Sequence, residues 1–204
     1  MKLKMITLFL ILSLKLSAQQ VLFNPADTWF FGAEAGLNTI ASFSQDEGNA
    51  SMQFGLVSEY YFAKQWSIIG RLKYFKTGVS FATRDDYARF DGAVISIPLS
   101  MKWEFKIYKN LRLNIKAGAS LNMEAKSDYN YPATIDTDFS KTYWNFNEGM
   151  GLNYFVSKNM AVYIDIEGFV LGGYKGHDNF FYLPIDHYTD NVFYNVGFKY
   201  SFKE

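Results

Sequence analysis

The sequence predicts an all-β protein, an eight-stranded antiparallel up-and-down transmembrane β-barrel. Three observations predict this fold: eight segments that alternate apolar and polar residues, connections that differ in length, and an aromatic content of 19%. Successive side chains of a strand point to opposite faces, so the alternation gives each strand one apolar and one polar face. Strands favour aromatic residues, and the membrane–water interface favours Trp and Tyr in particular.

The chain begins with the three parts of a secretory signal peptide. Two lysines precede an apolar run over residues 5–14, and a cleavage site of small residues ends at Ala18. The run is shorter than the roughly 20 apolar residues that a membrane-spanning helix needs. We therefore expect residues 1–18 to be a signal peptide and residues 19–204 to form the barrel domain.

Eight strands are predicted after this segment, and each is long enough for a tilted span, which takes about 9–11 residues. They are residues 29–43, 52–62, 66–78, 92–105, 111–121, 142–155, 160–170 and 192–202. In chain order, their apolar faces include Phe31 and Leu37; Phe54, Leu56 and Phe62; Ile68, Leu72 and Tyr74; Ile95, Ile97, Leu99, Met101 and Trp103; Leu111, Leu113 and Ile115; Phe146 and Met150; Val162, Ile164 and Ile166; and Val192, Tyr194, Val196, Phe198, Tyr200 and Phe202.

The connections between these strands alternate in length. Three of them are short: residues 63–65, 106–110 and 156–159. Four are longer and polar: residues 44–51, 79–91, 122–141 and 171–190. Short turns at one rim and long loops at the other are typical of an outer-membrane barrel, whose short turns are periplasmic. The last strand supports this location, because its apolar stripe ends on an aromatic residue, Phe202, close to the C-terminus.

Two residues disturb the alternation. Glu148 falls on the lipid-facing side of its strand, where a charge is unfavourable, so we expect a bulge near Gly149 that turns it inward. Pro98 lacks the backbone donor that a closed ladder uses and also predicts a bulge.

Charges of both signs occupy the predicted inner face. They are Glu34, Glu59, Arg71, Lys73, Lys102, Glu104, Arg112, Lys116, Asp165, Glu167 and Lys199. An eight-stranded barrel is only wide enough for its side chains to fill it, so we expect a closed polar core rather than an open pore. We expect Glu104 to meet Arg112 across a turn. Lys199 lies on the strand that closes against the strand of Glu34.

The composition of the chain limits the classes of partner that we expect. The 20 basic and 20 acidic residues cancel, which argues against nucleic acid, and the chain has no cysteine for disulfides or zinc–thiolate sites. We expect outer-membrane lipid as the surroundings, the barrel-assembly machinery as a partner during insertion, and a protein partner that the sequence does not identify.

Catalytic candidates are few. Two histidines, His177 and His187, lie in the last long loop beside Asp178 and Asp186, and an alcohol could come from a serine of the loops. Such serines are Ser80, Ser127 and Ser140. No spacing demands a triad or a metal site, so we expect no catalytic, cofactor or metal site. Two alternatives stay open: a small outer-membrane enzyme acting on lipid, as a lipid A deacylase or acyltransferase does, and a soluble lipocalin-like barrel with its apolar face inward.

Several segments resemble one family across nearly the whole mature chain. They are Gly32-Ala-Glu-Ala-Gly-Leu-Asn38, Gly55-Leu-Val-Ser-Glu-Tyr-Tyr-Phe62, Ile95-Ser-Ile-Pro-Leu-Ser-Met-Lys-Trp103, Lys116-Ala-Gly-Ala-Ser-Leu121, Gly151-Leu-Asn-Tyr-Phe-Val-Ser-Lys-Asn159 and Val196-Gly-Phe-Lys-Tyr-Ser-Phe202. The chain thereby resembles the PorT-like outer-membrane β-barrel proteins of Bacteroidetes, although it extends past the terminal aromatic by two residues.

The resemblance implies an eight-stranded barrel and brings no catalytic signature. The family's namesake takes part in type IX secretion and gliding, but this role does not transfer on loose motifs. The sequence therefore predicts a non-enzymatic integral protein of the cell outer membrane, structural or accessory to secretion or adhesion.

Overall fold

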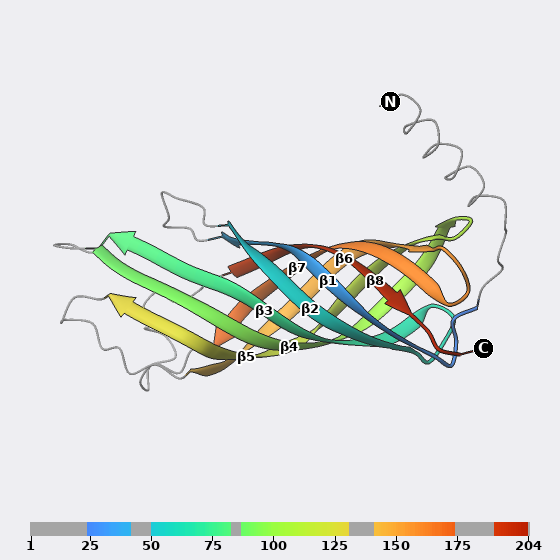
Figure 1. Cartoon of the computed structure of the whole chain (residues 1–204), viewed down its shortest axis with the longest axis horizontal. Helices are drawn as coiled ribbons and strands as arrows, with labels where there is room; N and C mark the ends of the chain where they lie inside the picture. Colours follow the sequence, from blue (N-terminus) through green and yellow to red (C-terminus); the bar gives the residue numbers. More distant parts are fainter. Residues whose placement is uncertain (1–23, 42–49, 83–86, 131–140, 174–189, 204) are drawn as a thin grey trace, which may run out of the picture.

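The computed structural model describes residues 24–41, 50–82, 87–130, 141–173 and 190–203 (Figure 1). Within these ranges the chain forms eight strands. They are β1 (Thr28–Ala41), β2 (Ala50–Tyr61), β3 (Trp66–Ala82), β4 (Tyr87–Tyr108), β5 (Leu111–Asn130), β6 (Thr142–Phe155), β7 (Met160–Gly173) and β8 (Asp190–Tyr200). The expected signal peptide lies outside these ranges and stays a prediction. No helix in the described ranges has the length and apolarity needed to cross a membrane.

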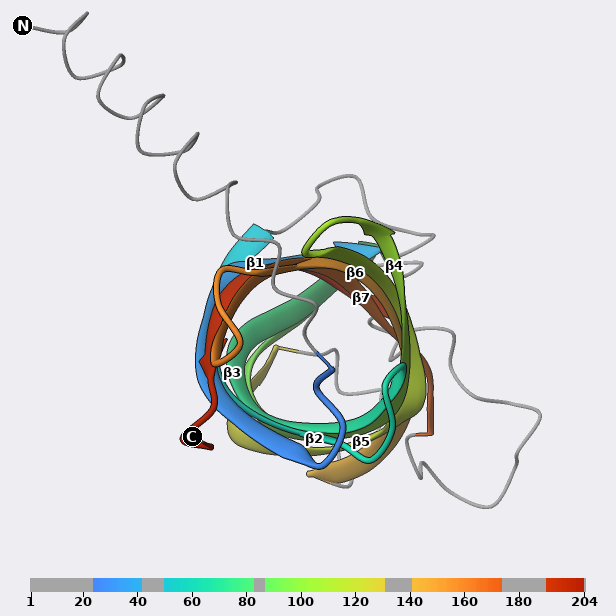
Figure 2. The ribbon, with the colours of Figure 1, turned by 90° about the vertical axis from the view of Figure 1, so that its right-hand side faces the viewer.

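The strands form a closed barrel in chain order. Each strand pairs antiparallel with the next, and β1 pairs with β8 to close the ring, which Figure 2 shows end-on. At this seam Ala35 lies opposite Val196 and Leu37 lies opposite Tyr194. Closure removes the unpaired strand edges that an open sheet would expose. The predicted eight-stranded antiparallel up-and-down architecture is confirmed.

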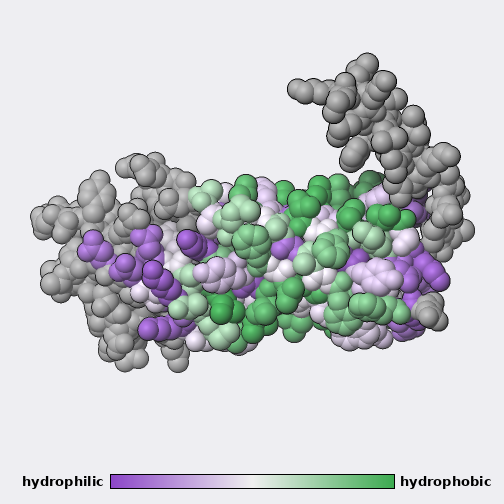
Figure 3. Space-filling model, viewed as in Figure 1, coloured by the Kyte–Doolittle hydropathy of each residue, from purple (hydrophilic) through white to green (hydrophobic). Residues whose placement is uncertain are grey.

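The outer surface of the barrel is apolar. Leu56, Leu99 and Val196, from three different strands, each expose about 60% of their surface: 60%, 58% and 63%. Figure 3 shows hydrophobic residues around the middle of the barrel and hydrophilic residues toward both ends. A lipocalin-like barrel would turn its apolar face inward, so this arrangement excludes that alternative.

Aromatic side chains gather on the outer surface at the rim of the short turns. Trp29 stacks on Tyr60 with ring centroids 4.9 Å apart, and Trp66 lies beside Trp103 at 6.4 Å. Trp29 and Trp66 lie where β1 and β3 begin, Tyr60 lies near the end of β2, and Trp103 of β4 lies opposite Trp66. A girdle of this kind marks a membrane–water interface, so the short-turn rim is one boundary of the apolar band.

Three strands extend farthest beyond their predicted ends at the loop-side rim. β3, β4 and β5 continue to residues 82, 87 and 130 beyond the loop-side rim, and Figure 1 shows them projecting past their neighbours. Residues 79–82 and 87–91 of the first predicted loop and residues 122–130 of the second are therefore strand. Their polar residues hide the strand pattern, because these strand ends have no apolar band to contact, while backbone pairing continues from Gly78 opposite Asp91 to Ala82 opposite Tyr87.

Both predicted bulges are wrong. Around Pro98 the β3–β4 register is the same on both sides, with Gly70 opposite Leu99 and Lys73 opposite Ser96. Pairing with β3 is interrupted at Pro98 and Ile97 and resumes in the same register, so no residue is inserted. Glu148 pairs in register with Ala117 and with Gly168, and its side chain is exposed on the outer face. The register shift of β6 lies instead between Trp144 and Phe146.

Candidate functional site

The barrel interior is the candidate site, because it holds a dense set of buried charges. All eleven charged residues assigned to the inner face from the sequence are buried there. Five are acidic and six are basic, and they come from every strand except β6. Buried charges are rarely tolerated unless they are paired, so their contacts decide what the interior can do.

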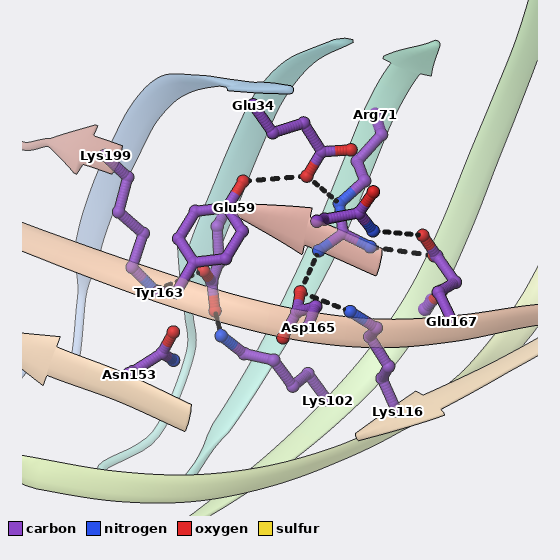
Figure 4. Close-up of polar contacts among 12 residues, drawn as sticks. Glu34, Glu59, Arg71, Lys102, Lys116, Asn153, Tyr163, Asp165, Glu167 and Lys199 are labelled. Atoms are coloured by element: carbon purple, nitrogen blue, oxygen red, sulfur yellow. Dashed lines mark hydrogen bonds and ion pairs between the residues drawn. The ribbon is translucent and has the colours of Figure 1, made fainter. Parts of the chain in front are cut away.

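Six of these residues form what we call the central cluster. Its members are Glu34, Arg71, Lys73, Lys116, Asp165 and Glu167. Arg71 is its hub: the Nε atom lies 3.2 Å from Glu34 Oε2, the Nη2 atom 2.6 Å from Asp165, and the Nη1 atom 2.8 Å from Glu167 (Figure 4). Three carboxylates thus surround one guanidinium.

Two lysines complete the charge balance of the central cluster. Lys73 contacts Glu34 Oε1 at 3.2 Å and also pairs with Glu167. Lys116 Nζ donates to Asp165 Oδ2 at 2.5 Å. With three acidic and three basic members, the cluster has no net formal charge, so each charge finds its compensation inside the barrel.

Glycines on intervening strands let these groups meet. Gly55 of β2 lies opposite both Glu34 and Lys73, and a Cβ atom there would lie 3.1 Å from the Glu34 side chain. Gly197 of β8 plays the same part between β7 and β1: the ring of Tyr163 crosses it, and the Tyr163 hydroxyl donates to Glu34 Oε2 at 2.8 Å. A Cβ atom at Gly197 would overlap that ring. Side chains two strands apart therefore interact directly.

The other five charges form what we call the mouth cluster, nearer the short-turn rim. Its members are Glu59, Lys102, Glu104, Arg112 and Lys199. Lys102 pairs with Glu59 and lies 2.7 Å from Glu104. Arg112 Nη1 lies 3.7 Å from Glu104 Oε2, which confirms the predicted contact across the turn.

Lys199 lies on the strand that closes against the strand of Glu34, as predicted, but it belongs to the mouth cluster. Its Nζ atom donates to Glu59 at 2.6 Å and to the Tyr61 hydroxyl at 2.9 Å, rather than pairing with Glu34. The reason is register: Lys199 lies opposite Gly32, whereas Glu34 lies opposite Gly197, one step farther from the rim on the same face. A Cβ atom at position 32 would overlap the β8 backbone at Phe198, so glycine there permits the close approach of β1 and β8.

Aromatic side chains fill the interior on the loop side of the central cluster and among the residues of the mouth cluster. On the loop side, Phe193 packs against Phe75 and Phe169 with ring centroids 4.8 Å from each, and Lys73 Nζ lies 4.5 Å from the Phe193 ring. On the turn side, the rings of Phe30 and Phe155 lie 6.0 Å apart, and both contact Lys199 Nζ. Cations over aromatic rings gain from the ring quadrupole, which helps to hold the lysines in place.

A cavity of about 510 Å³ opens at the short-turn rim. Its lining includes Glu104, Phe155 and four cationic residues, which are Lys64, Lys106, Lys109 and Arg112. The cationic residues outnumber the single acidic one, and a concave surface of one sign concentrates its field. This mouth therefore favours anions over cations.

The catalytic candidates do not form a site in the part of the chain that the structure describes. His177, Asp178, Asp186 and His187 lie outside the described residues, as does Ser140. Ser80 and Ser127 lie on β3 and β5, which are not neighbours. Among the described residues no group of three or more His, Cys, Asp or Glu could hold a metal ion. The expected absence of a catalytic, cofactor or metal site stays a prediction.

Solved structures with the same architecture come from other bacterial outer membranes. OprG from Pseudomonas aeruginosa is 13% identical, with a TM-score of 0.60 over 89% of this chain and 100% of that one. Neisserial surface protein A is 15% identical, with a TM-score of 0.58 over 85% and 97%. Ail, the attachment invasion locus protein of Yersinia pestis, is 14% identical, with a TM-score of 0.52 over 87% and 99%. At these identities the likeness concerns the fold alone.

Sequence comparison identifies the family. No curated protein sequence matches the chain. A family model described as the outer membrane protein beta-barrel domain matches residues 6–202. The match covers all eight strands, and it agrees with the apolar outer surface and the aromatic girdle. The chain therefore belongs to the outer membrane protein β-barrel domain family and is a protein of the outer membrane.

Proposed function

We propose that this chain is a non-enzymatic integral barrel with a closed polar core, structural or accessory to secretion or adhesion. The observation that carries the proposal is the pairing of the inner charges with one another, together with the aromatic side chains that pack around them. A conducting pore needs a continuous path of water, and these side chains occupy the space where it would run. Partners would then bind at the rims or at the lipid-facing surface.

The PorT-like resemblance is part of this proposal. The motifs that suggest it lie on strands of the barrel, for example Ile95 to Trp103 on β4 and Val196 to Phe202 at the end of the chain. We also propose that the barrel-assembly machinery inserts the chain, because the terminal strand presents an aromatic stripe to lipid. Purifying a tagged protein from its native outer membrane and identifying the proteins that accompany it tests the accessory role.

Thiol labelling tests the closed core directly, because the chain has no cysteine of its own. Ser100 lies inside the barrel with 3% of its surface exposed, and cysteine is close to serine in size. We expect Ser100→Cys in folded, detergent-solubilised protein to resist a bulky maleimide. The matched control is Lys109→Cys in an exposed turn, which should react at once, and urea should make both react.

Two results would contradict the closed core. One is labelling of Ser100→Cys at the rate of the Lys109→Cys control. The other is steady single-channel conductance of the wild-type protein in a planar bilayer. Either would require a water path through the two clusters.

Replacing His177 and His187 with Ala tests the non-enzymatic part of the proposal. Loss of a general base removes a contribution of about 10²–10⁴-fold in rate. We expect lipid A mass spectra of a deletion strain to be the same whether it carries the wild-type or the double-Ala gene. A lipid A species that disappears on deletion, returns with the wild type and fails to return with the double variant would establish an enzyme.

A further inference from the structure

One carboxylate stands on the lipid-facing side of the barrel, at Glu148 of β6. Its neighbours on the same face of the strand are Phe146 and Met150, which expose 42% and 58% of their surface. The strand is in regular register on both sides of Glu148, opposite Ala117 of β5 and Gly168 of β7. The backbone therefore fixes the outward direction of this side chain.

Glu148 lies well inside the apolar band. On the same face of β6, Trp144 lies near the loop side and Tyr154 near the turn side, ten residues apart. At about 3.3 Å per residue and a tilt of about 40°, these ten residues span roughly 25 Å, the height of the band in barrels of this kind. Glu148 is four residues from Trp144, or roughly 10 Å below it. An ionisable group at this depth is unfavourable unless it has a partner.

The chain itself offers no such partner among the residues that the structure describes. Glu148 makes no hydrogen bond or ion pair with any of them, unlike every acidic residue of the interior. The outward side chains around it are apolar, among them Ile115 and Ile166 on the two adjacent strands. Other outward-facing charges, such as Lys76, lie toward the loop-side rim.

The outer surface beside Glu148 is also formed by small residues. Its two cross-strand neighbours are small, Ala117 and Gly168, and Ala119 extends the small surface on β5, whereas Ile166 and Val170 flank Gly168 on β7. A Cβ atom at Gly168 would meet only the Glu148 side chain, at 3.9 Å. Small residues at a membrane-facing surface let two surfaces approach closely, so that polar groups can meet away from lipid.

We propose that this face of β5, β6 and β7 is an interface between two copies of the chain. In a two-fold symmetric contact each residue on the axis meets its own equivalent, so Glu148 meets Glu148 of the second copy. Two carboxyl groups that share one proton, or that each carry one, are hydrogen-bond donor and acceptor to each other. The second copy thus brings the missing partner at the same depth. This interface is independent of the closed core and of the accessory role.

Disulfide cross-linking in lipid vesicles tests the interface. Ala117→Cys places a thiol next to Glu148, and the matched control is Leu56→Cys on β2, the strand on the opposite side of the barrel. At high lipid-to-protein ratio we expect oxidation to join two copies through Ala117→Cys and far less through Leu56→Cys. Equal yields at the two positions would show collision alone and would overturn the proposal.

Variants at Glu148 separate the carboxyl pair from simple apolar contact. In the Ala117→Cys background, E148Q keeps a group that donates and accepts and should keep the dimer. E148L removes it and should weaken dimerisation about 5- to 30-fold, the range for polar contacts in membranes. Heat-dependent gel migration confirms that each variant is folded. Unchanged dimerisation in E148L would overturn the carboxyl pair.

A charge exchange sharpens the test further. E148K alone should not dimerise, because two cations would meet. Mixed with a differently tagged protein that retains Glu148, it should form heterodimers, because an ion pair replaces the carboxyl pair. Failure of the mixture to cross-link would count against the interface. Cross-linking of Ala117→Cys in native membranes to a different protein, with no dimer, would assign the face to that protein and overturn the proposal.

Discussion

The central cluster and the mouth cluster contain the same kinds of charged residue but differ in their charge balance. The central cluster has three acidic and three basic members, all paired at short range. The mouth cluster has two acidic and three basic members, and its third cation, Arg112, lies at the cavity. Their positions in the barrel explain the difference. Where the wall and the aromatic side chains exclude water, charges must cancel locally; where a cavity admits water, a surplus is tolerated.

The comparison also separates two kinds of contribution to stability. In the central cluster, removing one partner leaves a buried charge without compensation, which is the expensive way to break an ion pair. In the mouth cluster, solvent can take over part of the role of a lost partner. The two clusters should therefore respond very differently to the same substitution.

The largest effect is expected for Arg71→Met. The substitution removes the cation that contacts Glu34, Asp165 and Glu167, and it leaves three acidic residues with two lysines. We expect the free energy of unfolding to fall by about 3–5 kcal/mol. Urea unfolding in vesicles, followed by tryptophan fluorescence, measures it. The control is Leu72→Met on the outer face of the same strand, where the loss should stay below about 1.5 kcal/mol.

A compensating substitution tests whether the loss is electrostatic. Asp165→Asn in the Arg71→Met background restores the balance to two acidic and two basic members. The double variant should be more stable than the sum of the two single losses implies, with a coupling of about 0.5–3 kcal/mol. Strict additivity would mean that Arg71 acts through its packing instead of its charge.

An intermediate effect is expected for Gly197→Ala. The added methyl group would overlap the Tyr163 ring and push it away from Glu34, and overpacking of this kind costs about 1–3 kcal/mol. The control is Gly168→Ala on β7, where a Cβ atom makes only an ordinary contact on the outer face. Equal unfolding midpoints for the two variants would show that the interior can move to accept the methyl group.

Alternation, together with the connection lengths and the aromatic content, was enough to predict the barrel, and alternation alone predicted which charges lie in its interior. Period-two patterning assigns a residue to a face whatever its partner is, so all eleven inner charges were placed correctly. It could not predict which of them meet. The partner of Lys199 is set by strand register, and register depends on pairing between strands that a single sequence does not show. Inward glycines such as Gly55 were a usable signal, because each marks a place where side chains of flanking strands can meet.

The sequence was least informative where charge contradicts alternation. Glu148 was predicted to turn inward through a bulge because a lipid-facing carboxylate is unfavourable, yet the strand keeps its register there. The unfavourable free energy of one lipid-facing side chain is a weak guide to backbone geometry, because a bulge would disrupt the backbone hydrogen-bond ladder around it. The loop-side ends of β3, β4 and β5 were not predicted, because they carry no apolar stripe that would distinguish them from loop.

The smallest effect is expected for Arg112→Met, the counterpart of Arg71→Met in the mouth cluster. Glu104 keeps its contact with Lys102 at 2.7 Å, and methionine can keep the packing on the Phe155 ring, from which the Arg112 guanidinium carbon lies 4.9 Å. Removing the surplus cation even leaves the cluster with two acidic and two basic members. We therefore expect a loss of no more than about 1 kcal/mol, in the range of partly solvated ion pairs. The measurement is the same urea titration, performed side by side with Arg71→Met at two salt concentrations. A loss as large as that of Arg71→Met would show that the mouth is as dry as the centre, and the distinction between the two clusters would fail.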